Sequence, residues 1–360
     1  MIDVEAQQQT VATLRDSFQA LQAEQTRLEA TLEHLDEDIS RLCSVARDLG
    51  YEGTLPEPRS TRVNCGAILL YHRVASLSPD PARLCIATDV FRAQMEHLAR
   101  TCEPMALPTL TDAAVDGQLP RGAVAITLDD GYVDALTAAD ILCALHMPAT
   151  FFVNSNAGGE TLLDSLTRIF LLGQPIPEEL ALSVIGTTVR LPCGSDQARR
   201  ATFDALREIV WSLSSDGRRE LLAAVGRWSG LDLPARPSHR LLTPAELREL
   251  ASRPGQDIGA HTENHLFLPV QPRSVKIAEI ATNREYLQAL LGRDVLSFAF
   301  PYGAFDLETV QICRSMGFHS CVTVVGQPVR PWSDPWLLPR NEVKAQTVEE
   351  FEAFVAALYL

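Results

Sequence analysis

The stretch "AVAITLDDGYVDALTAADILCAL" (residues 123–145) joins an apolar run to a helical pattern through two adjacent acids and a glycine. A short apolar run that ends at a turn signal is typical of a buried strand. The apolar residues that follow are spaced three and four apart, which is typical of a helix. Alternation of this kind recurs along the chain and predicts a mainly parallel sheet, open or closed into a barrel.

The same two patterns mark the other predicted elements. Strands are expected at residues 67–71, 123–128, 149–153, 257–260, 296–300 and 320–325. Helices are expected at residues 91–100, 135–145, 243–251, 274–291 and 307–316. Active sites of such folds lie at the carboxyl ends of the strands, so the residues that follow each apolar run are the first to inspect.

A helical insertion at about residues 155–242 interrupts this alternation. It contains two helical stretches, "LLDSLTRIFLL" and "SDQARRATFDALREIVWSLSS", and one strand signal, "LSVIGTTVRL". Because long connections in such folds often carry function, we expect the insertion to roof or wall the substrate site.

The N-terminal residues have a different pattern. From Val11 to Leu49, apolar residues fall alternately three and four apart, and only Gln25 interrupts the apolar seam. This heptad pattern predicts a coiled-coil helix that pairs with a second copy, most simply as a parallel homodimer through residues 11–49. The alternative is one amphipathic helix packed on its own domain. The predicted organisation is a coiled-coil helix (1–50), a Pro- and Gly-containing linker (51–65) and an α/β domain (66–360).

Composition narrows the class of protein. The chain has 360 residues, 46% of them hydrophobic, so it can bury a full core. Its formal net charge of −15 would repel a phosphate backbone, which argues against a nucleic-acid partner. The eight cysteines include no CxxC pair and are expected to be reduced thiols. With neither a signal-like N-terminus nor an apolar run long enough for a transmembrane segment, we expect a cytoplasmic protein.

Two acids at the end of the 123–128 run are the first candidates for chemistry. Gly131 follows Asp129 and Asp130 and offers a turn that can send both side chains toward one pocket. Close carboxylates favour a shared metal or two separated pKa values. The alternative is that both acids are solvated or cap the following helix.

The stretch "GAHTENH" (residues 259–265) supplies two histidines after another predicted strand. If the segment is helical, His261 and His265 lie on one face and suit a divalent metal. Alternatively, one histidine belongs to the core and the other is exposed. Together with Asp130, these histidines would give two nitrogens and one carboxylate, with positions left for water and substrate. That set suits Zn2+, although Co2+, Ni2+, Mn2+ and Fe2+ also fit.

These residues resemble the motifs of the NodB-type polysaccharide deacetylases, or carbohydrate esterase family four. The stretch "TLDDG" (127–131) is similar to their T-F-D-D-G motif, and "HTENH" (261–265) to their H-S/T-x-x-H motif. The resemblance covers roughly residues 66–345 and implies a distorted (β/α) barrel. It also implies a base, Asp129, three metal ligands, Asp130, His261 and His265, and a buttressing residue, Thr262.

The third family motif, R-x-P-x-G, is matched in part by "AFPYG" (299–303), with Ala299 where the family has arginine. Relatives with an F-A-Y-P-Y-G version share this difference. The resemblance implies that the backbone N–H of Tyr302 helps to hold the oxyanion. Arg340 in "LLPRNEV" is our candidate for the missing arginine, which steadies the base, and a purely structural ion pair is the alternative.

The last family motif, L-x-H, supplies a histidine that protonates the leaving amine. It normally lies near the C-terminus, but "FEAFVAALYL" at the end of this chain has no histidine. The early stretch "LYH" (70–72) resembles that of relatives with a permuted motif order, which implies that His72 is the general acid. The alternative is a packing histidine.

The resemblance implies metal-dependent hydrolysis of the acetamide of an N-acetylated sugar to an amine and acetate, on a glycan, a glycolipid or a sugar intermediate. Two alternatives remain open. A small-molecule amidase or an O-acetyl esterase would use the same site, and a catalytically inactive barrel would leave the coiled coil as an assembly module.

Overall fold

The computed structural model describes residues 64–360, except 156–158, 185–186, 235, 345 and 360. The predicted coiled coil and nearly all of the predicted linker lie outside the described residues. The homodimer through residues 11–49 therefore stays a prediction.

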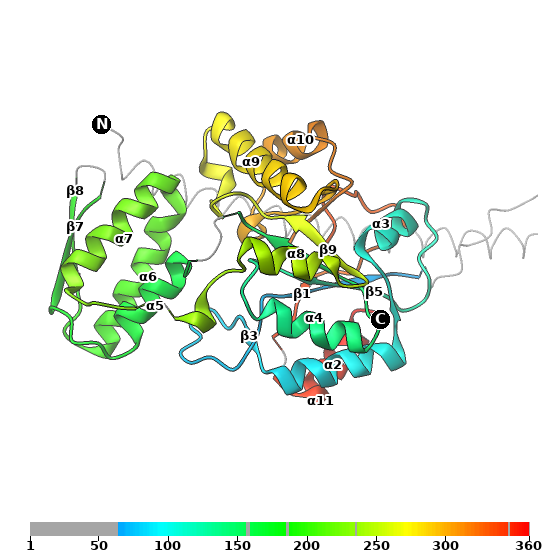
Figure 1. The fold of residues 1–360 in the computed structure, drawn as a ribbon, viewed down its shortest axis with the longest axis horizontal. Helices are drawn as coiled ribbons and strands as arrows, with labels where there is room; N and C mark the ends of the chain where they lie inside the picture. Colours follow the sequence, from blue (N-terminus) through cyan, green and yellow to red (C-terminus); the bar gives the residue numbers. More distant parts are fainter. Residues whose placement is uncertain (1–63, 156–158, 185–186, 235, 345, 360) are drawn as a thin grey trace, which may run out of the picture. The chain divides into compact units, whose positions relative to one another are not determined.

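A curved, entirely parallel sheet forms the centre of the described domain (Figure 1). Its central strands, at residues 67–71, 123–128 and 149–153, are apolar and wholly buried, as expected for a parallel sheet covered on both faces. The strand order is β11-β10-β9-β6-β5-β1-β12, and β4 pairs with β5. The strands are β1 (Ala67–Tyr71), β4 (Glu103–Pro104), β5 (Ala123–Leu128), β6 (Ala149–Val153), β9 (Gln256–Ala260), β10 (Ser297–Ala299), β11 (Ser320–Val322) and β12 (Asn341–Glu342).

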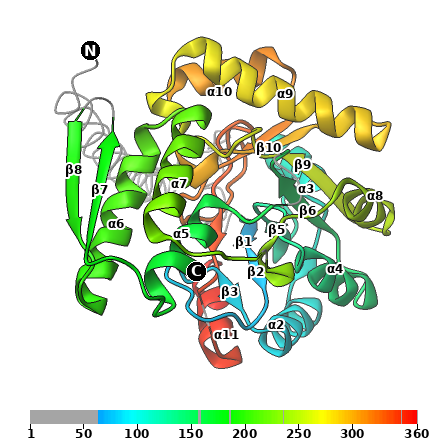
Figure 2. The same ribbon diagram turned by 60° about the vertical axis from the view of Figure 1, so that its left-hand side comes forward.

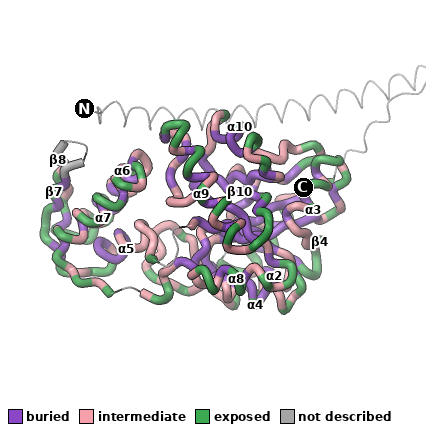
Figure 3. The backbone as a smooth tube through the Cα atoms, turned by 45° about the horizontal axis from the view of Figure 1, so that its top comes forward, coloured by how far each residue is buried: buried purple, intermediate pink, exposed green. Residues whose placement is uncertain are grey.

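Helices surround the outer face of this sheet (Figure 2). They are α2 (Thr88–Thr101), α4 (Ala135–Ala144), α8 (Pro244–Ser252), α9 (Arg273–Leu291), α10 (Leu307–Ser315) and α11 (Val348–Ala357). Helix α3 (Leu107–Val115) instead packs on side chains of the opposite face, among them Ile68, Ala125 and Phe152. Local sequence sets where they begin. For example, Thr243 and Glu246 form a reciprocal capping box at the start of α8, where Pro244 fits the first turn. Buried residues concentrate on the strands and on the inner sides of these helices (Figure 3).

A C-terminal segment joins the two edges of the sheet. Leu338 bridges Val322 in parallel at the β11 edge, and Asn341 in β12 pairs with Leu69 in β1 at the other edge. The sheet therefore curls into the distorted (β/α) barrel that the sequence predicts. Arg340 lies between the two contacts and is fully buried. A separate short parallel pair, β2 (Arg73–Val74) and β3 (Cys85–Ile86), follows β1.

The residues between β6 and β9 form a second, smaller core beside the barrel (Figures 1 and 2). The elements are α5 (Leu162–Leu171), β7 (Glu179–Val184), β8 (Thr187–Pro192), α6 (Asp196–Ser212) and α7 (Ser215–Ser229). The single strand signal at 182–191 proves to be part of an antiparallel hairpin in which Leu182 pairs with Val189. Helix α7 was not predicted, because Gly217 and Gly226 lower its intrinsic helix propensity. Burial of Leu221 and Val225 in the second core stabilises it instead.

Among the described residues, three short 3-10 helices complete the fold: η1 (Pro237–His239), η2 (Leu268–Val270) and η3 (Pro301–Gly303). None of the helices in the described part of the chain is both long enough and apolar enough to span a membrane. The seven cysteines in the same part are all free thiols.

Candidate metal centre

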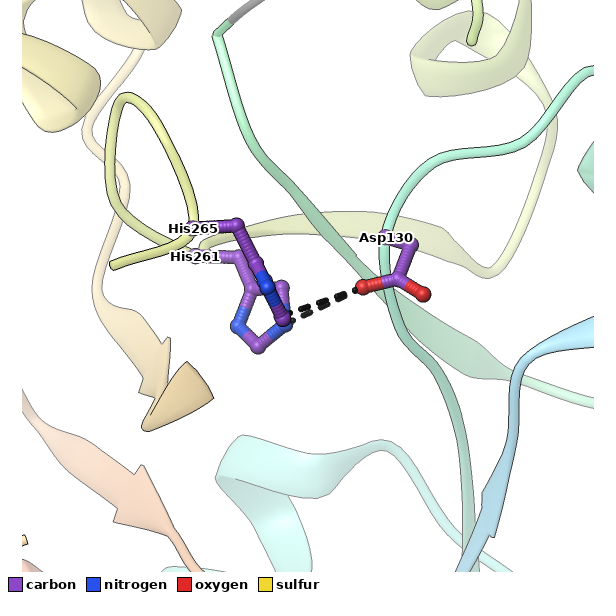
Figure 4. Close-up of side chains that lie close together, drawn as sticks. All are labelled: Asp130, His261 and His265. Carbon is purple, nitrogen blue, oxygen red and sulfur yellow. Dashed lines mark ion pairs between the residues drawn. The ribbon is translucent and has the colours of Figure 1, made fainter. Parts of the chain in front are cut away.

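Three predicted ligands converge at the carboxyl ends of β5 and β9 (Figure 4). Asp130 follows β5, whereas His261 directly follows β9 and His265 lies in the loop beyond it. The Nε2 atoms of His261 and His265 are 3.5 and 3.3 Å from Oδ1 of Asp130. One ligand atom from each residue lies within 4.8 Å of the others. The parallel sheet brings these residues together because both strands end at the same edge.

Unusual backbone conformations aim these side chains. Seven non-glycine residues in the described part of the chain have positive φ, and four of them lie in the three motifs: Asp130 (74°), Thr262 (64°), His265 (52°) and Tyr302 (59°). Left-handed conformations cost free energy for residues with a Cβ, and such strain is often found at functional sites. Asp130 itself makes the turn together with Gly131, so two neighbours in sequence can face one pocket. The four-residue spacing of the histidines would place them on one face of a helix, but residues 261–265 form a loop.

Hydrogen bonds hold the histidine loop. Nδ1 of His261 is 2.8 Å from the carbonyl oxygen of Ala299. If Nδ1 carries the proton and donates it in a hydrogen bond to that oxygen, the lone pair of Nε2 is available to a metal. The backbone N–H of His261 donates to Oδ1 of Asn283 at 2.9 Å. Thr262 Oγ1 accepts a hydrogen bond from the backbone N–H of His265 at 3.0 Å. The two imidazole rings lie 4.8 Å apart.

Electrostatics suit this donor set to a cation. Burial lowers the pKa of His265 to about 3, so its imidazole is neutral at pH 7. Burial would raise the pKa of Asp130, but the hydrogen bond from His261 and the electrostatic interactions with the neighbouring histidines outweigh it and keep the pKa low. Burial would lower the pKa of His261, yet the nearby carboxylates of Asp129 and Asp130 raise it. An ionised carboxylate beside two imidazole nitrogens fits a divalent transition-metal ion.

Asp129 has a different partner. Nη1 and Nη2 of Arg340 donate to its two carboxylate oxygens at 2.7 and 2.6 Å. Arg340 also donates to Thr127 Oγ1 at 3.2 Å and to the carbonyl oxygen of Thr323 at 2.8 Å. Burial would raise the pKa of Asp129, but Arg340 and His261 outweigh it, so the pKa lies below its ordinary value. Asp129 is therefore ionised and fixed in orientation, 4.0 Å from Nε2 of His261.

The two remaining predicted residues flank this centre. His72 follows β1, and its charge lowers the pKa values of both aspartates. Its Nδ1 is 3.6 Å from Oε1 of Glu342 in β12. Tyr302 lies in η3, with its ring 4.5 Å from that of His265 and 42% of its surface exposed.

Sequence reasoning missed three supporting residues. Asn154 Nδ2 donates to the carbonyl oxygen of Asp130 at 3.0 Å, and its position directly after β6 was a usable signal. Asn283 bridges His261 to Val153 from within α9, where nothing in the sequence marks it. Arg218 in α7 donates to the carbonyl oxygen of His265 at 2.7 Å, again without a sequence signal.

A comparison with protein-family models matches residues 116–321, more than half of the chain, to the polysaccharide deacetylase model. The chain belongs to the polysaccharide deacetylase family. The match includes Asp129, Asp130 and both histidines of the metal centre. It ends before Arg340 and begins after His72. Members of this family are generally hydrolytic, divalent-metal-dependent carbohydrate deacetylases.

Solved structures of other deacetylases share the fold. This polysaccharide deacetylase is similar to the Streptococcus pyogenes deacetylase PplD in complex with acetate, with 17% identity, a TM-score of 0.54, and coverage of 81% of this chain and 98% of that one. For IcaB from Ammonifex degensii the identity is 18%, the TM-score 0.55, and the coverage 82% and 98%. A polysaccharide deacetylase from Bacillus cereus has 15% identity, a TM-score of 0.51, and coverage of 81% and 69%. No curated protein sequence matches significantly.

Proposed function

We propose that this chain is a metal-dependent N-deacetylase that hydrolyses the acetamide of an N-acetylated carbohydrate to an amine and acetate. One observation carries the proposal: Asp130, His261 and His265 converge around a common point beside a separately held carboxylate, Asp129. The two acids of one turn therefore have different surroundings, which suits them to different tasks.

Asp130, His261 and His265 would hold the metal. A divalent ion bound there would acidify water and polarise the acyl oxygen of the substrate. Zn2+ is the ion we favour, since tetrahedral sites with imidazole and carboxylate ligands and an open position are typical of hydrolytic zinc.

The other residues handle protons and charge. Asp129, ionised and oriented by Arg340, takes the proton from the water whose oxygen attacks the carbonyl carbon. The backbone N–H of Tyr302 donates to the oxyanion that develops on the substrate. As the C–N bond breaks, His72 donates a proton to the departing nitrogen; its Nδ1 lies 3.6 Å from Oε1 of Glu342.

Several finer features belong to the same proposal. We place the chain in the subgroup with a permuted motif order, because His72 lies at the barrel end that holds the metal centre. Ala299 stands where the family motif has an arginine, and Arg340 supplies a buried cation beside Asp129 instead. This ion pair supports a catalytic rather than an inactive barrel. A cytoplasmic location and a coiled-coil homodimer remain part of the proposal.

Substitution of Asp129 and of the metal ligand His265 tests the roles. We expect Asp129→Asn to abolish release of acetate while the protein still binds Zn2+, and His265→Ala to lose both. Acetate and free amine would be measured on N-acetyl sugars, chitooligomers and acetyl esters, with metal content determined in parallel. An active Asp129→Asn protein would exclude Asp129 as the base. Turnover of the esters alone would favour the O-acetyl esterase.

A further inference from the structure

Side chains from the second core reach the metal centre. Trp211, in the last turn of α6, stacks on Phe267 with ring centroids 5.5 Å apart and planes 15° from parallel. The ring centroids of Trp211 and Phe267 lie 6.1 and 6.2 Å from that of Tyr302. The ring centroid of Tyr302 in turn lies 4.5 Å from that of His265. We call Trp211, Phe267 and Tyr302 the aromatic platform.

This aromatic platform remains accessible to solvent. Tyr302 is 42% exposed, and Trp211 and Phe267 are half-buried. Leaving three contacting aromatic rings exposed to water costs free energy unless a ligand covers them. Their position beside a metal ligand means that such a ligand also reaches the reaction centre.

A buried arginine fixes the platform relative to the metal centre. Nε of Arg218 donates to the carbonyl oxygen of Val210, the residue before Trp211, at 3.2 Å. Nη1 of the same guanidinium donates to the carbonyl oxygen of His265 at 2.7 Å. Arg218 is only 8% exposed, and its Nη2 atom is buried with no hydrogen-bond partner in the described part of the chain. One side chain thus ties the residue before Trp211 to a metal ligand.

We propose that the aromatic platform binds the sugar ring next to the N-acetylated residue, so that the enzyme prefers an oligosaccharide to a single sugar. The apolar face of a pyranose carries weakly positive C–H groups, which pack favourably on the negative faces of aromatic rings. Rigid aromatic side chains also lose little entropy on binding. The proposal rests on the proposed function for the identity of the neighbouring residue, and it assigns specificity to Trp211, which lies outside the motifs.

Replacing Trp211 by leucine tests this assignment, because leucine keeps an apolar contact with Phe267 but removes the ring. The deacetylation of an N-acetylglucosamine tetramer would be compared with that of the monomer. We expect Trp211→Leu to raise KM for the tetramer about tenfold, as loss of one aromatic contact would, and to leave kcat/KM for the monomer unchanged. Trp211→Phe should restore most of the preference. Trp332→Ala, which removes an exposed ring from the segment after β11, is the matched control.

A second measurement separates this proposal from the proposed function. Binding of the glucosamine tetramer, the deacetylated form, would be followed by calorimetry on the Zn2+-loaded protein. We expect the tetramer to bind more tightly than glucosamine, and the difference to disappear in Trp211→Leu but not in Trp332→Ala. The proposed role of the aromatic platform would be refuted if Trp211→Leu affected monomer and tetramer equally, or if the unmodified protein bound glucosamine and the tetramer with equal affinity. Tetramer binding without any deacetylation would instead overturn the proposed function alone.

Discussion

Replacing Arg340 by methionine would leave the Asp129 carboxylate buried with no cation beside it. Arg340 is fully buried and Asp129 is 4% exposed, so water cannot replace the lost partner. Removing one member of such a pair typically lowers the free energy of unfolding by about 3–5 kcal/mol. Methionine retains much of the aliphatic volume, so the loss would report mainly on the unpaired charge and on the bonds to Thr127 and Thr323.

The pH dependence of this loss has a definite sign. In the unmodified protein the pKa of Asp129 lies below its ordinary value, so the pair stabilises the fold above pH 4 or so and loses that contribution only as pH falls through the lower folded pKa. Without Arg340, burial should raise the folded pKa above the unfolded value. The stability of Arg340→Met should therefore rise as pH falls from 7 to 5, and the gap to the unmodified protein should narrow.

Urea unfolding at pH 7 and pH 5, with metal removed from every sample, would measure both effects. Asp129→Asn and the double variant complete a double-mutant cycle, in which the double variant should lose less than the sum of the single losses. Arg219→Met, which removes an exposed ion pair with Asp216, is the control and should change stability by no more than about 0.5 kcal/mol. A loss below about 1 kcal/mol for Arg340→Met, or a gap that widens at pH 5, would refute the reasoning.

Three further outcomes follow from the geometry. His261→Ala and His265→Ala should each lose bound Zn2+ on dialysis, because each removes one of three ligands; retention of one equivalent would exclude that residue as a ligand. Zn2+ affinity should fall between pH 8 and pH 6 in calorimetry, because the raised pKa of His261 makes a proton compete with the metal, and a flat profile would contradict this. Gly303→Ala should lower the melting temperature more than Gly292→Ala: both glycines have φ near 66°, but only at Gly303 would the new Cβ clash with the side chain of Val324. Equal losses would show that backbone strain, not that clash, sets the cost.

Much of the barrel could be predicted because buried parallel strands appear as continuous apolar runs. The predicted bounds of β1, β5 and β6 agree with the structure. Strand β12 is harder to recognise, because Asn341 and Glu342 have no strand pattern of their own; they pair with Leu69 and Leu70 in β1. The hairpin of β7 and β8 was missed for a related reason, since a continuous run of strand-forming residues does not mark where the chain reverses.

The candidate site divides in the same way. Residues after strands, such as Asp130 and His261, are predictable because topology brings strand ends together. The left-handed conformation of Asp130 was not predicted, because the following glycine appeared sufficient for the turn. Trp211 and Arg218 reach the site through packing of the second core against the histidine loop, and no local pattern encodes such a contact.

The closing segment of the barrel has a consequence for how the site is assembled. Arg340 and Asp129 are 211 positions apart, and the cation arrives with the residues that join the two edges of the sheet. During synthesis from the N-terminus, Asp129, Asp130 and both histidines emerge well before Arg340, the cation that pairs with Asp129. A chain that stops before residue 335 would carry every ligand of the metal centre, yet it would have to keep Asp129 protonated or leave it in water. Completion of the C-terminal segment thus supplies the cation that stabilises the ionised, buried form of Asp129.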